Sequence, residues 1–455
     1  MRKEIVSQRS LLCQAMNLLL SVFKPEKMMK KMDAIIDANP NIVAAVHADL
    51  TWAVNDSGRY GLLSAERVLR SAVLKQLKGY SYRELRQRIH DSVGLRWFTR
   101  FDCDRVPHFT ALQKAIKCIK PETWAGINEM LVQYAKDKKL EKGKSLRVDT
   151  TVVEANIAYP VDARLLWDSI RVLTRIMEAC RQVLPDINFA FAKRTRRAKK
   201  CCYGIVMAKG PKAEQRRKKL YTDLIKVANE VFRMAGSCCQ QLKISPHIEA
   251  EAFYEQLDHY LTLTAVAIDQ CERRVLKGET VPASEKIVSI FEEHTDIIKR
   301  GKSQSPTEFG HKVLVASAKS GLITQYEVFR GNPGDSEMLS DILTRHQSQY
   351  GHAPDNLCGD RRFFSSANEK MAYKNQVKKV SICKPGYRSQ ARQQMEKQSW
   401  FKKLKRFRAG IEGIISVLMR ACGLKRCLWK GWRSFRSYVG LGIVTFNLRK
   451  IAELS

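Results

Sequence analysis

Acidic residues are scarce in this sequence relative to basic ones. The chain has 455 residues, of which 46 are Asp or Glu and 80 are Lys or Arg, so its formal net charge is +34. It also lacks an uninterrupted apolar run of about 18 residues, which excludes a membrane-spanning helix. Its 13 cysteines form no CxxC pair and no His/Cys cluster at zinc spacing, which excludes the common structural zinc sites.

The cysteines that are present are scattered, apart from two adjacent pairs, Cys201-Cys202 and Cys238-Cys239. Adjacent cysteines suit neither tetrahedral metal binding nor ordinary disulfides. We therefore predict reduced thiols, which are typical of a cytosolic protein. The expected location is the cytoplasm, and no membrane partner is expected.

The positive charge predicts a polyanionic partner, and nucleic acid is the commonest one. A ribosome-associated protein or a protein of a membrane surface is the alternative interpretation. The Lys and Arg residues are spread over the whole chain rather than confined to one tail. This distribution favours a large DNA-contacting surface over a basic anchor.

The start of the chain has basic residues followed by an apolar patch, a pattern that weakly resembles a signal peptide. It has no clear small-residue cleavage site. An amphipathic helix explains the patch better, because its apolar residues share one helical face. These residues are Leu11, Leu12, Met16, Leu19, Leu20 and Phe23.

Helical periodicity continues to about residue 140. Ser64 is predicted to cap a helix over residues 65–78, and the turn 79–81 leads into a second helix that exposes Arg83 and Arg86. This order is compatible with a DNA-binding helix-turn-helix. A plain helical hairpin is the commoner explanation of the same pattern. We expect an all-helical N-terminal domain over residues 1–140 that recognises DNA ends.

A strand is predicted where the periodicity changes at Ser145. Apolar and polar residues alternate there, with Leu146, Val148 and Val152 against Arg147, Asp149 and Thr151. The alternation places Asp149 on the face of the strand opposite the apolar residues.

Helical periodicity returns between about residues 157 and 300. This stretch holds two basic clusters, at residues 193–200 and 216–219. A solvated helix face explains either cluster alone. Two clusters so close together favour phosphate contact, because each neutralised phosphate releases counterions. The basic residues singled out for DNA binding are Arg196, Arg197, Lys199 and Lys200.

Strands and helices alternate in the last third of the chain. The expected elements are strands at 311–317 and 322–330, a helix from 336, a strand at 356–360, a helix at 366–374, a strand at 377–383 and a helix from about 407 to the end. This order is close to that of a ribonuclease-H-like fold. The expected fold is therefore α/β, with a ribonuclease-H-like catalytic domain over 145–455, interrupted by a helical insertion at about 157–300, and an all-helical N-terminal DNA-binding region.

Three acids occur where chemistry is plausible in such a fold. Asp149 lies on the first strand, Asp360 ends a later strand, and Glu412 lies on the final helix, four residues after Arg408. Hard divalent metals prefer carboxylate oxygens, and two Mg²⁺ ions about 3.5–4 Å apart stabilise both the attacking and the leaving oxygen in phosphoryl transfer. Ordinary surface acids are the alternative interpretation, since most of the acids in any chain are ordinary.

Several longer stretches are similar to the DDE transposases of bacterial insertion sequences, in particular the ISNCY group and its relatives. They occur in family order over about residues 60–455. They are residues 62–112, with LSAERVLRSAVLKQLKGYSYRELRQRI, WFTRF and PHFTAL; residues 146–173, which begin LRVDTTVVEANIAYP; SPTEFGHKV at 305–313; GNPGDSEML at 331–339; DNLCGDRRFFSSAN at 355–368; and RFRAGIEGIISVLMRACGLKR at 406–426.

The resemblance implies that Asp149, Asp360 and Glu412 are the catalytic, metal-binding triad. It implies two Mg²⁺ ions, for which Mn²⁺ can substitute. The family's last motif commonly has a Tyr and a Lys where this chain has Lys405 and Met419, so the residues that grip phosphate are open. Arg408, Lys425 and Arg426 are the candidates in this motif.

The expected function is that of a DNA transposase, which hydrolyses a phosphodiester at the element's end and then transfers the strand to target DNA. The partners would be double-stranded DNA, as terminal inverted repeats and target, and a second copy of the chain in a synaptic homodimer. The resemblance also implies a bacterial, nucleoid-associated protein. The alternatives are a nuclease of the same fold that does not join DNA, and an inactive DNA-binding derivative.

Other residues are weaker candidates. Asp335 is expected to cap the helix that starts at Ser336 rather than to bind metal. His311 is expected to be structural, although it could face the site. Glu154 and Asn156 are expected at most to support the residues of the triad, without binding metal themselves. The tryptophans that could stack on bases are more readily explained by core packing; they are Trp167, Trp429 and Trp432.

Overall fold

Two units, divided near Ala155 and Gly310, make up the chain. The computed structural model describes residues 26–52, 63–299 and 307–455. Unit 1 comprises residues 1–155 and 310–455, and unit 2 comprises residues 156–309. The amphipathic helix expected over residues 11–23 lies outside the described residues. No helix in the described ranges is both long and apolar enough to cross a membrane.

Unit 1 begins with helices, and the local sequence explains how they begin and end. The side chain of Ser64 accepts a hydrogen bond from the backbone N–H of Arg67, and Gly79 ends the helix in the left-handed conformation at φ 68°. Ser81 and Glu84 form a capping box at the next helix. The Ser64 cap and the turn at 79–81 are thus confirmed. The helices are α2 Lys27–Asp37, α3 Pro40–Trp52, α4 Ala65–Lys78, α5 Tyr82–Asp91, α6 Val93–Thr99, α7 Phe109–Cys118 and α8 Pro121–Asp137.

A buried arginine ties the first helices together. Arg70 of α4 is fully buried. It donates to Asp33 and Asp37 of α2 at 2.6 and 2.5 Å. Arg100 reaches Asp37 as well, at 2.9 Å. A buried guanidinium needs such partners, because an unpaired buried charge is strongly destabilising.

The mixed sheet has the strand order β2-β3-β1-β5-β6, with β4 pairing with β3. β1 runs antiparallel to β3 and parallel to β5. The predicted strand at Ser145 and the predicted hairpin around residues 319–321 are both confirmed. The strands are β1 Ser145–Glu154, β2 Asp296–Lys299, β3 Thr307–Ala318, β4 Ile323–Val328, β5 Asn356–Gly359 and β6 Lys379–Ser381.

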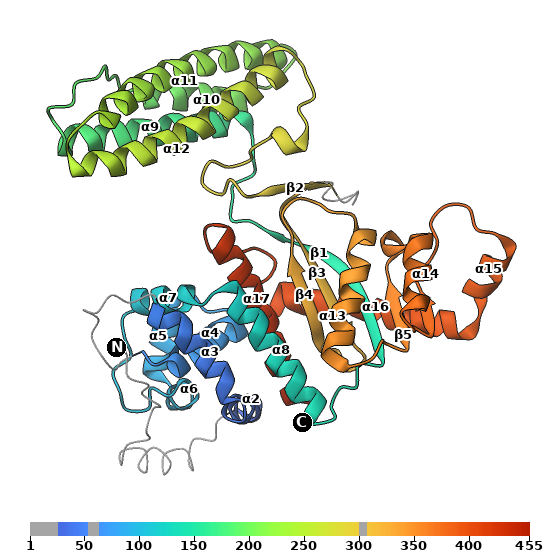
Figure 1. Ribbon diagram of the computed structural model, residues 1–455. Coiled ribbons are helices and arrows are strands. Elements are labelled where there is room, and N and C mark those ends of the chain that lie inside the picture. Colours follow the sequence, from blue (N-terminus) through green and yellow to red (C-terminus); the bar gives the residue numbers. More distant parts are fainter. Residues whose placement is uncertain (1–25, 53–62, 300–306) are drawn as a thin grey trace. The chain divides into compact units, whose positions relative to one another are not determined.

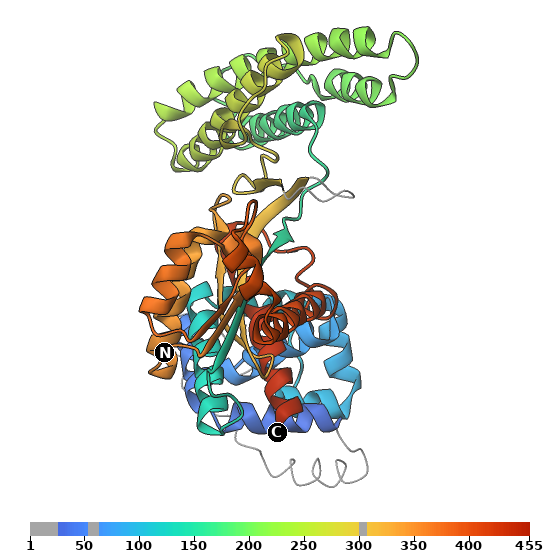
Figure 2. The ribbon, with the colours of Figure 1, turned by 90° about the vertical axis from the view of Figure 1, so that its right-hand side faces the viewer.

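Helices cover both faces of this sheet (Figure 1). On one face, Leu146 and Val148 of β1 share a core with Leu339 and Ile342. On the other face, Val153 of β1 joins a core formed with the N-terminal helices and the last helix. Figure 2 shows the sheet edge-on between these helices. The helices that follow the sheet strands are α13 Leu339–Tyr350, α14 Ser366–Lys374, α15 Gln390–Lys397, α16 Ser399–Ala421 and α17 Trp432–Leu454.

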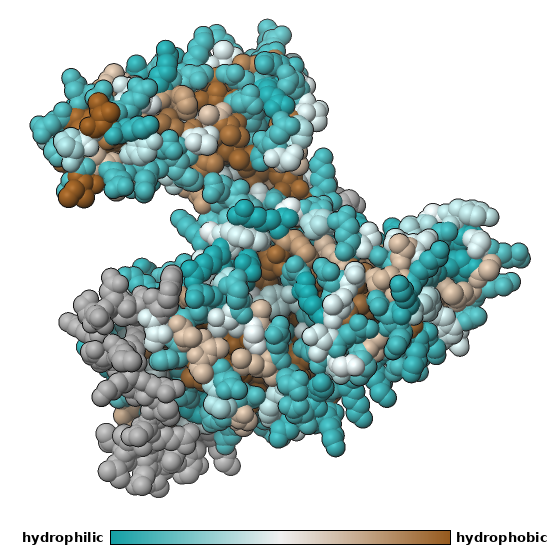
Figure 3. Space-filling view, in the orientation of Figure 1, coloured by the Kyte–Doolittle hydropathy of each residue, from teal (hydrophilic) through white to brown (hydrophobic). Residues whose placement is uncertain are grey.

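Unit 2 is built around four helices. They are α9 Asp162–Val183, α10 Thr195–Met207, α11 Ala213–Lys243 and α12 Ile248–Cys271. They bury a core of their own that includes Leu166, Leu224 and Leu257. Brown apolar patches interrupt its otherwise hydrophilic surface in Figure 3. Its exposed apolar side chains include Val183, Tyr203, Val206, Met207, Ile244 and Ile248.

The sequence interpretation of the C-terminal region was wrong in one respect. A single helix was expected from about 407 to the end, but α16 begins at Ser399 and ends at Ala421, and α17 follows from Trp432. Gly423 and Gly431, at φ 68° and 83°, allow the chain to turn between α16 and α17. The short β2 and α15 were not expected.

All of the cysteines in the described ranges are free, as expected from the sequence. The sulfurs of Cys180 and Cys238 lie 4.0 Å apart in the core of unit 2. Burial raises the pKa of the Cys238 thiol above its ordinary value. A buried thiol with a raised pKa is poorly reactive.

Candidate active site

Two of the three predicted acids lie next to each other because of the sheet register. In the parallel pairing of β1 with β5, Val148 lies opposite Gly359. Asp149 directly follows Val148 in the sequence, and Asp360 directly follows Gly359. Ligands of α/β folds gather where the carboxyl ends of parallel strands meet. The register therefore brings Asp149 and Asp360 to the same place.

The third acid comes from α16, which packs against both β1 and β5. Arg408 of this helix links the elements. Its Nη2 donates to Oε1 of Glu412 at 2.8 Å, and its Nη1 lies 3.6 Å from Oδ2 of Asp149. The pairing of Arg408 with Glu412 spans one helical turn, as the sequence predicted.

The three carboxylates have different surroundings. Oδ1 of Asp149 accepts the backbone N–H of Thr150 at 2.8 Å, and Oδ1 of Asp360 accepts the backbone N–H of Arg361 at 2.7 Å. Asp360 caps the short helix Arg361–Phe363 in this way. The side chain of Asp149 is 17 % exposed and that of Glu412 is 64 % exposed. The carboxylate of Asp149 is thus mostly buried and fixed by a backbone hydrogen bond, whereas that of Glu412 faces solvent.

The chemistry of these donors fits a hard divalent ion, because all of them are carboxylate oxygens. Within the described residues, no three His, Cys, Asp or Glu side chains lie close enough together to hold a metal ion. The guanidinium of Arg408 lies against Asp149 and Glu412 and neutralises part of their charge. A divalent cation bound by these carboxylates would therefore replace part of their ion pairing with Arg408, and Glu412, which is exposed, would have room to reach it.

A thiol near the acids is not a candidate nucleophile. Cys358 lies on β5, two residues before Asp360, and is fully buried. Burial raises the pKa of Cys358 to about 12, although Arg147 and Arg408 act in the opposite direction. The thiolate, which is the reactive form, is therefore rare at neutral pH.

The sequence interpretation did not single out Arg147, which holds α16 onto β1. Its Nη1 donates to the carbonyl of Phe407 at 2.8 Å, and its Nε donates to Oγ of Ser317 on β3 at 2.8 Å. Arg147 is buried, and burial lowers the pKa of its guanidinium. The available signal was a basic residue two positions before a candidate acid, on the same face of the strand.

Asp335 does not cap a helix, contrary to expectation. Gly334 occupies the capping position of the short helix Asp335–Met338, and no side chain caps it. Asp335 is buried and instead accepts from Lys312 at 2.9 Å and from Thr150 at 3.3 Å. It was misassigned because its partners come from β1 and β3, which are distant in sequence.

The basic residues at the end of the last motif differ in their environments. Arg426 donates to Oε2 of Glu154 through Nε and Nη2, at 3.0 and 2.8 Å. The backbone around it pairs with the end of β1 through Glu154. Lys425 is exposed beside it. Lys425 is thus more available than Arg426 to bind phosphate. Glu154 has a structural role as the partner of Arg426.

The other basic candidates are at the surface of their own units. Arg83 of α5 is exposed, with its guanidinium carbon 5.1 Å from the centre of the Phe109 ring, and Arg86 is half-buried. In unit 2, the candidate residues on α10 are all exposed. These are Arg196, Arg197, Lys199 and Lys200.

His311 is structural, as favoured from the sequence. It is fully buried, and its ring lies edge-on to Trp432 and Phe435 at 4.6 and 4.7 Å. Trp429 is also buried in the core of unit 1, which confirms core packing. Trp167 packs against the core of unit 2 and also lines a pocket of about 310 Å³ there.

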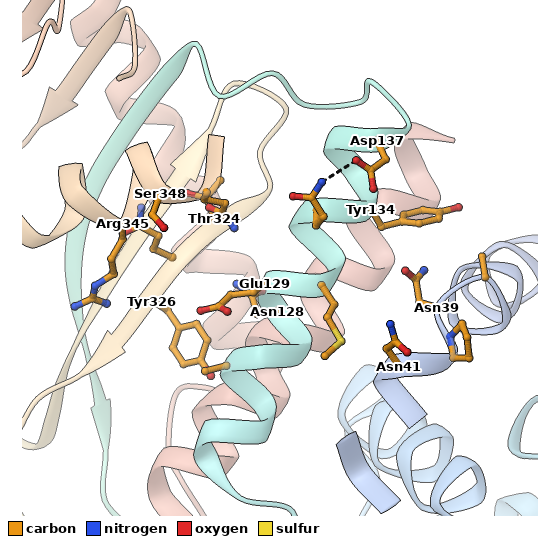
Figure 4. A pocket seen from close by; sticks show the side chains of 17 residues that line it. Asn39, Asn41, Asn128, Glu129, Tyr134, Asp137, Thr324, Tyr326, Arg345 and Ser348 are labelled. Carbon is orange, nitrogen blue, oxygen red and sulfur yellow. Dashed lines mark hydrogen bonds between the residues drawn. The ribbon is translucent and has the colours of Figure 1, made fainter. Parts of the chain in front are cut away.

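A larger pocket of about 670 Å³ in unit 1 lies elsewhere, between α8, β4, α13 and the turn from α2 to α3. Figure 4 shows Glu129, Asp137 and Asn128 on α8 across from Tyr326 and Arg345. None of the three candidate acids lines it. The carboxylates of Glu129 and Asp137 in this pocket repel phosphate, so the candidate chemistry remains at β1, β5 and α16.

Two family models match the chain. A transposase domain, DUF772, matches residues 18–118, and a transposase DDE domain matches residues 365–452. The second match contains Glu412, whereas Asp149 and Asp360 lie between the two matches. No curated protein and no solved structure matches significantly.

The order of the two matches agrees with the order of motifs in the sequence. A DDE domain implies a ribonuclease-H-like fold, which agrees with the mixed sheet flanked by helices. The matches do not separate the ISNCY group from its relatives, so that narrower assignment stays a prediction. The two transposase domain matches, one towards each end of the chain, together support a DDE transposase of the insertion-sequence type.

Proposed function

We propose that this transposase hydrolyses a phosphodiester at the ends of an insertion sequence and transfers the freed strand to target DNA, with Asp149, Asp360 and Glu412 as its catalytic triad. The observation that carries the proposal is the register of Val148 opposite Gly359, which brings two acids from distant motifs together. The ion pairs of Arg408 with Asp149 and Glu412 support the inclusion of the third.

The triad would hold two Mg²⁺ ions, for which Mn²⁺ can substitute. Such ions supply Lewis acidity and stabilise the charge that develops on the oxygens of an in-line displacement. Asp149, on the strand between β3 and β5, would contact both ions. Asp360 and Glu412 would each complete one.

The chain's own residues orient the reacting groups. Arg408 sets the direction of Glu412 through its ion pair, and once a metal replaced that pairing its planar guanidinium would be released to bind a DNA phosphate with two hydrogen bonds. Lys425, and Arg426 when released from Glu154, would hold the backbone near the scissile bond. A water attacks the phosphodiester first, and the released 3′-hydroxyl then attacks target DNA. No covalent intermediate with the protein is involved.

DNA recognition is assigned to the basic surfaces outside the triad. Residues 1–140 would recognise the terminal inverted repeats, with Arg83 and Arg86 of α5 contributing. The catalytic domain would span 145–455, and the helices inserted at about 157–300 would add phosphate contacts from α10 through Arg196, Arg197, Lys199 and Lys200. Two copies of the chain would pair the two element ends as a homodimer.

The test uses the purified full chain with Mn²⁺ or Mg²⁺ and the DNA that flanks its own gene. Wild type should cut the element end and join a pre-cut end to a target plasmid. Asp149→Asn should abolish both reactions and keep DNA binding. Asp341→Asn, which changes an exposed acid of α13, is the matched control and should react normally.

The outcomes separate the alternatives. Cleavage without joining of the pre-cut end would identify a nuclease of the same fold. DNA binding without either reaction, in wild type as well as in Asp149→Asn, would identify an inactive derivative. Normal cleavage by Asp149→Asn would contradict the assigned triad.

A further inference from the structure

Arg147 occupies an unusual position for a charged residue. It lies on β1, two residues before Asp149 and therefore on the same face of the strand. It is only 7 % exposed. Its hydrogen-bond partners are neutral, the hydroxyl of Ser317 and the peptide carbonyl of Phe407. Burying a charge against neutral partners is unfavourable, and an apolar residue of similar size commonly gives a more stable core.

The contacts of Arg147 connect the three elements around the candidate acids. Ser317 lies on β3, Arg147 on β1 and Phe407 on α16, and the guanidinium carbon lies 4.6 Å from the centre of the Phe407 ring. Phe407 directly precedes Arg408, the residue that contacts both Asp149 and Glu412. A planar guanidinium donates in fixed directions, so these bonds define where α16 lies on β1.

Gly410 completes this arrangement from the helix. A Cβ atom at this position would lie 2.3 Å from Nη1 of Arg147. The guanidinium cannot give way without losing its bonds to Ser317 and Phe407. Any larger residue at position 410 would therefore push the helix away from the strand or displace Arg147.

We infer that Arg147, seated against Gly410, is a positioning residue that sets the placement of α16 on β1 and thereby the spacing between Asp149 and Glu412. This inference rests on the proposed function, because it assigns Arg147 a role toward the same triad. Arg147 does not itself touch DNA or metal in this role. A shift of about 1 Å in a catalytic group can lower a rate by about a hundredfold.

The experiment compares wild type with Arg147→Met, Arg147→Lys and Gly410→Ala. Phe401→Leu is the control, because Phe401 is a buried residue of the same helix that makes none of these contacts with Arg147. Thermal melting reports stability, and a filter assay with the gene's flanking DNA in EDTA reports binding. Single-turnover cleavage is measured over a range of Mn²⁺ concentrations. Electron paramagnetic resonance measures Mn²⁺ binding without DNA.

Arg147→Met and Gly410→Ala should stay folded and bind DNA, while the cleavage rate falls by about a hundredfold. The Mn²⁺ concentration for half-maximal cleavage and the Mn²⁺ dissociation constant should both rise by about tenfold. Arg147→Lys should restore part of the loss, because an ammonium can make one of the two bonds. Phe401→Leu should lower the melting temperature without changing the Mn²⁺ dependence.

Unchanged Mn²⁺ dependence and Mn²⁺ binding in Arg147→Met and Gly410→Ala would overturn the inference. If Arg147→Met does not fold, Gly410→Ala decides the question, because it keeps every atom of Arg147. The proposed function fails separately, if wild type does not cleave or if Asp149→Asn cleaves normally. An active wild type with an inactive Asp149→Asn and normal positioning variants would remove only the role of Arg147.

Discussion

The guanidinium of Arg408 lies 3.6 Å from the carboxylate of Asp149, although the two residues are 259 positions apart in the sequence. The same guanidinium holds Glu412 at 2.8 Å. One side chain therefore contacts acids from the first and the last motif. Its position depends on the packing of α16 against β1.

Replacing Arg408 with Lys should lower single-turnover DNA cleavage by about 10- to 100-fold, the usual effect of losing a residue that orients a ligand. A lysine keeps the charge, but its single ammonium cannot span both carboxylates as the fork of a guanidinium does. Cleavage of end-labelled DNA at saturating Mn²⁺ measures the effect. Arg406→Lys, an exposed arginine on the same helix, is the control and should cleave normally. Equal activity of the two variants would contradict a bridging role.

Removing Asp335 should destabilise unit 1. Asp335→Ala leaves the buried ammonium of Lys312 without its carboxylate, which typically costs about 3–5 kcal/mol. Thermal melting should show a clearly lower transition for this variant than for Asp341→Ala, which removes an exposed acid nearby in the sequence. Adding Lys312→Met should recover part of the stability, since the uncompensated charge is gone. If Asp335→Ala melted at the same temperature as wild type, the pair of Asp335 and Lys312 would contribute little to stability.

The basic face of α10 should contribute to DNA affinity by neutralising phosphates. Changing Arg196, Arg197, Lys199 and Lys200 to Gln should reduce the slope of log affinity against log salt by about 0.9 for each phosphate that is no longer neutralised. Binding to the flanking DNA is measured between low and moderate salt. A variant with Lys226, Arg233 and Lys243 of α11 neutralised is the comparison. Equal slopes in both variants would assign the effect to net charge rather than to the α10 cluster.

The stability of unit 1 should fall as the pH is lowered below about 6.5. Burial lowers the pKa of His346 from 6.5 to about 4, and its Nε2 donates to the carbonyl of Gly143 at 2.9 Å. Between these values the unfolded chain binds a proton that the folded chain does not, so stability decreases as pH falls. Each pH unit in this window costs about 1.4 kcal/mol.

Thermal melting at pH 7, 6 and 5 checks this expectation. His346→Gln removes the titrating group and keeps a donor for Gly143, so its melting temperature should depend less on pH than that of wild type. His108→Gln, which alters an exposed histidine of unit 1, is the control and should follow wild type. Parallel curves for all three proteins would exclude His346 as the source.

Local sequence was sufficient for several elements of this protein. The cap at Ser64, the glycine turn at 79 and the strand at Ser145 follow from signals that act within a few residues, such as capping bonds and alternation of apolar side chains. The helix at 366–374 was predicted with the bounds that the structure has. The acids of the candidate triad were named from their local motifs.

Tertiary structure decided which of those residues meet. Only strand register places Asp149 beside Asp360, and only helix packing brings Arg408 to Asp149. Asp335 was misread and Arg147 was missed for the same reason, since their partners are Lys312, Ser317 and Phe407, each more than twenty positions away. The residue types that can perform the chemistry are a property of the sequence. Their spacing depends on buried contacts between distant segments, which periodicity and motifs do not encode.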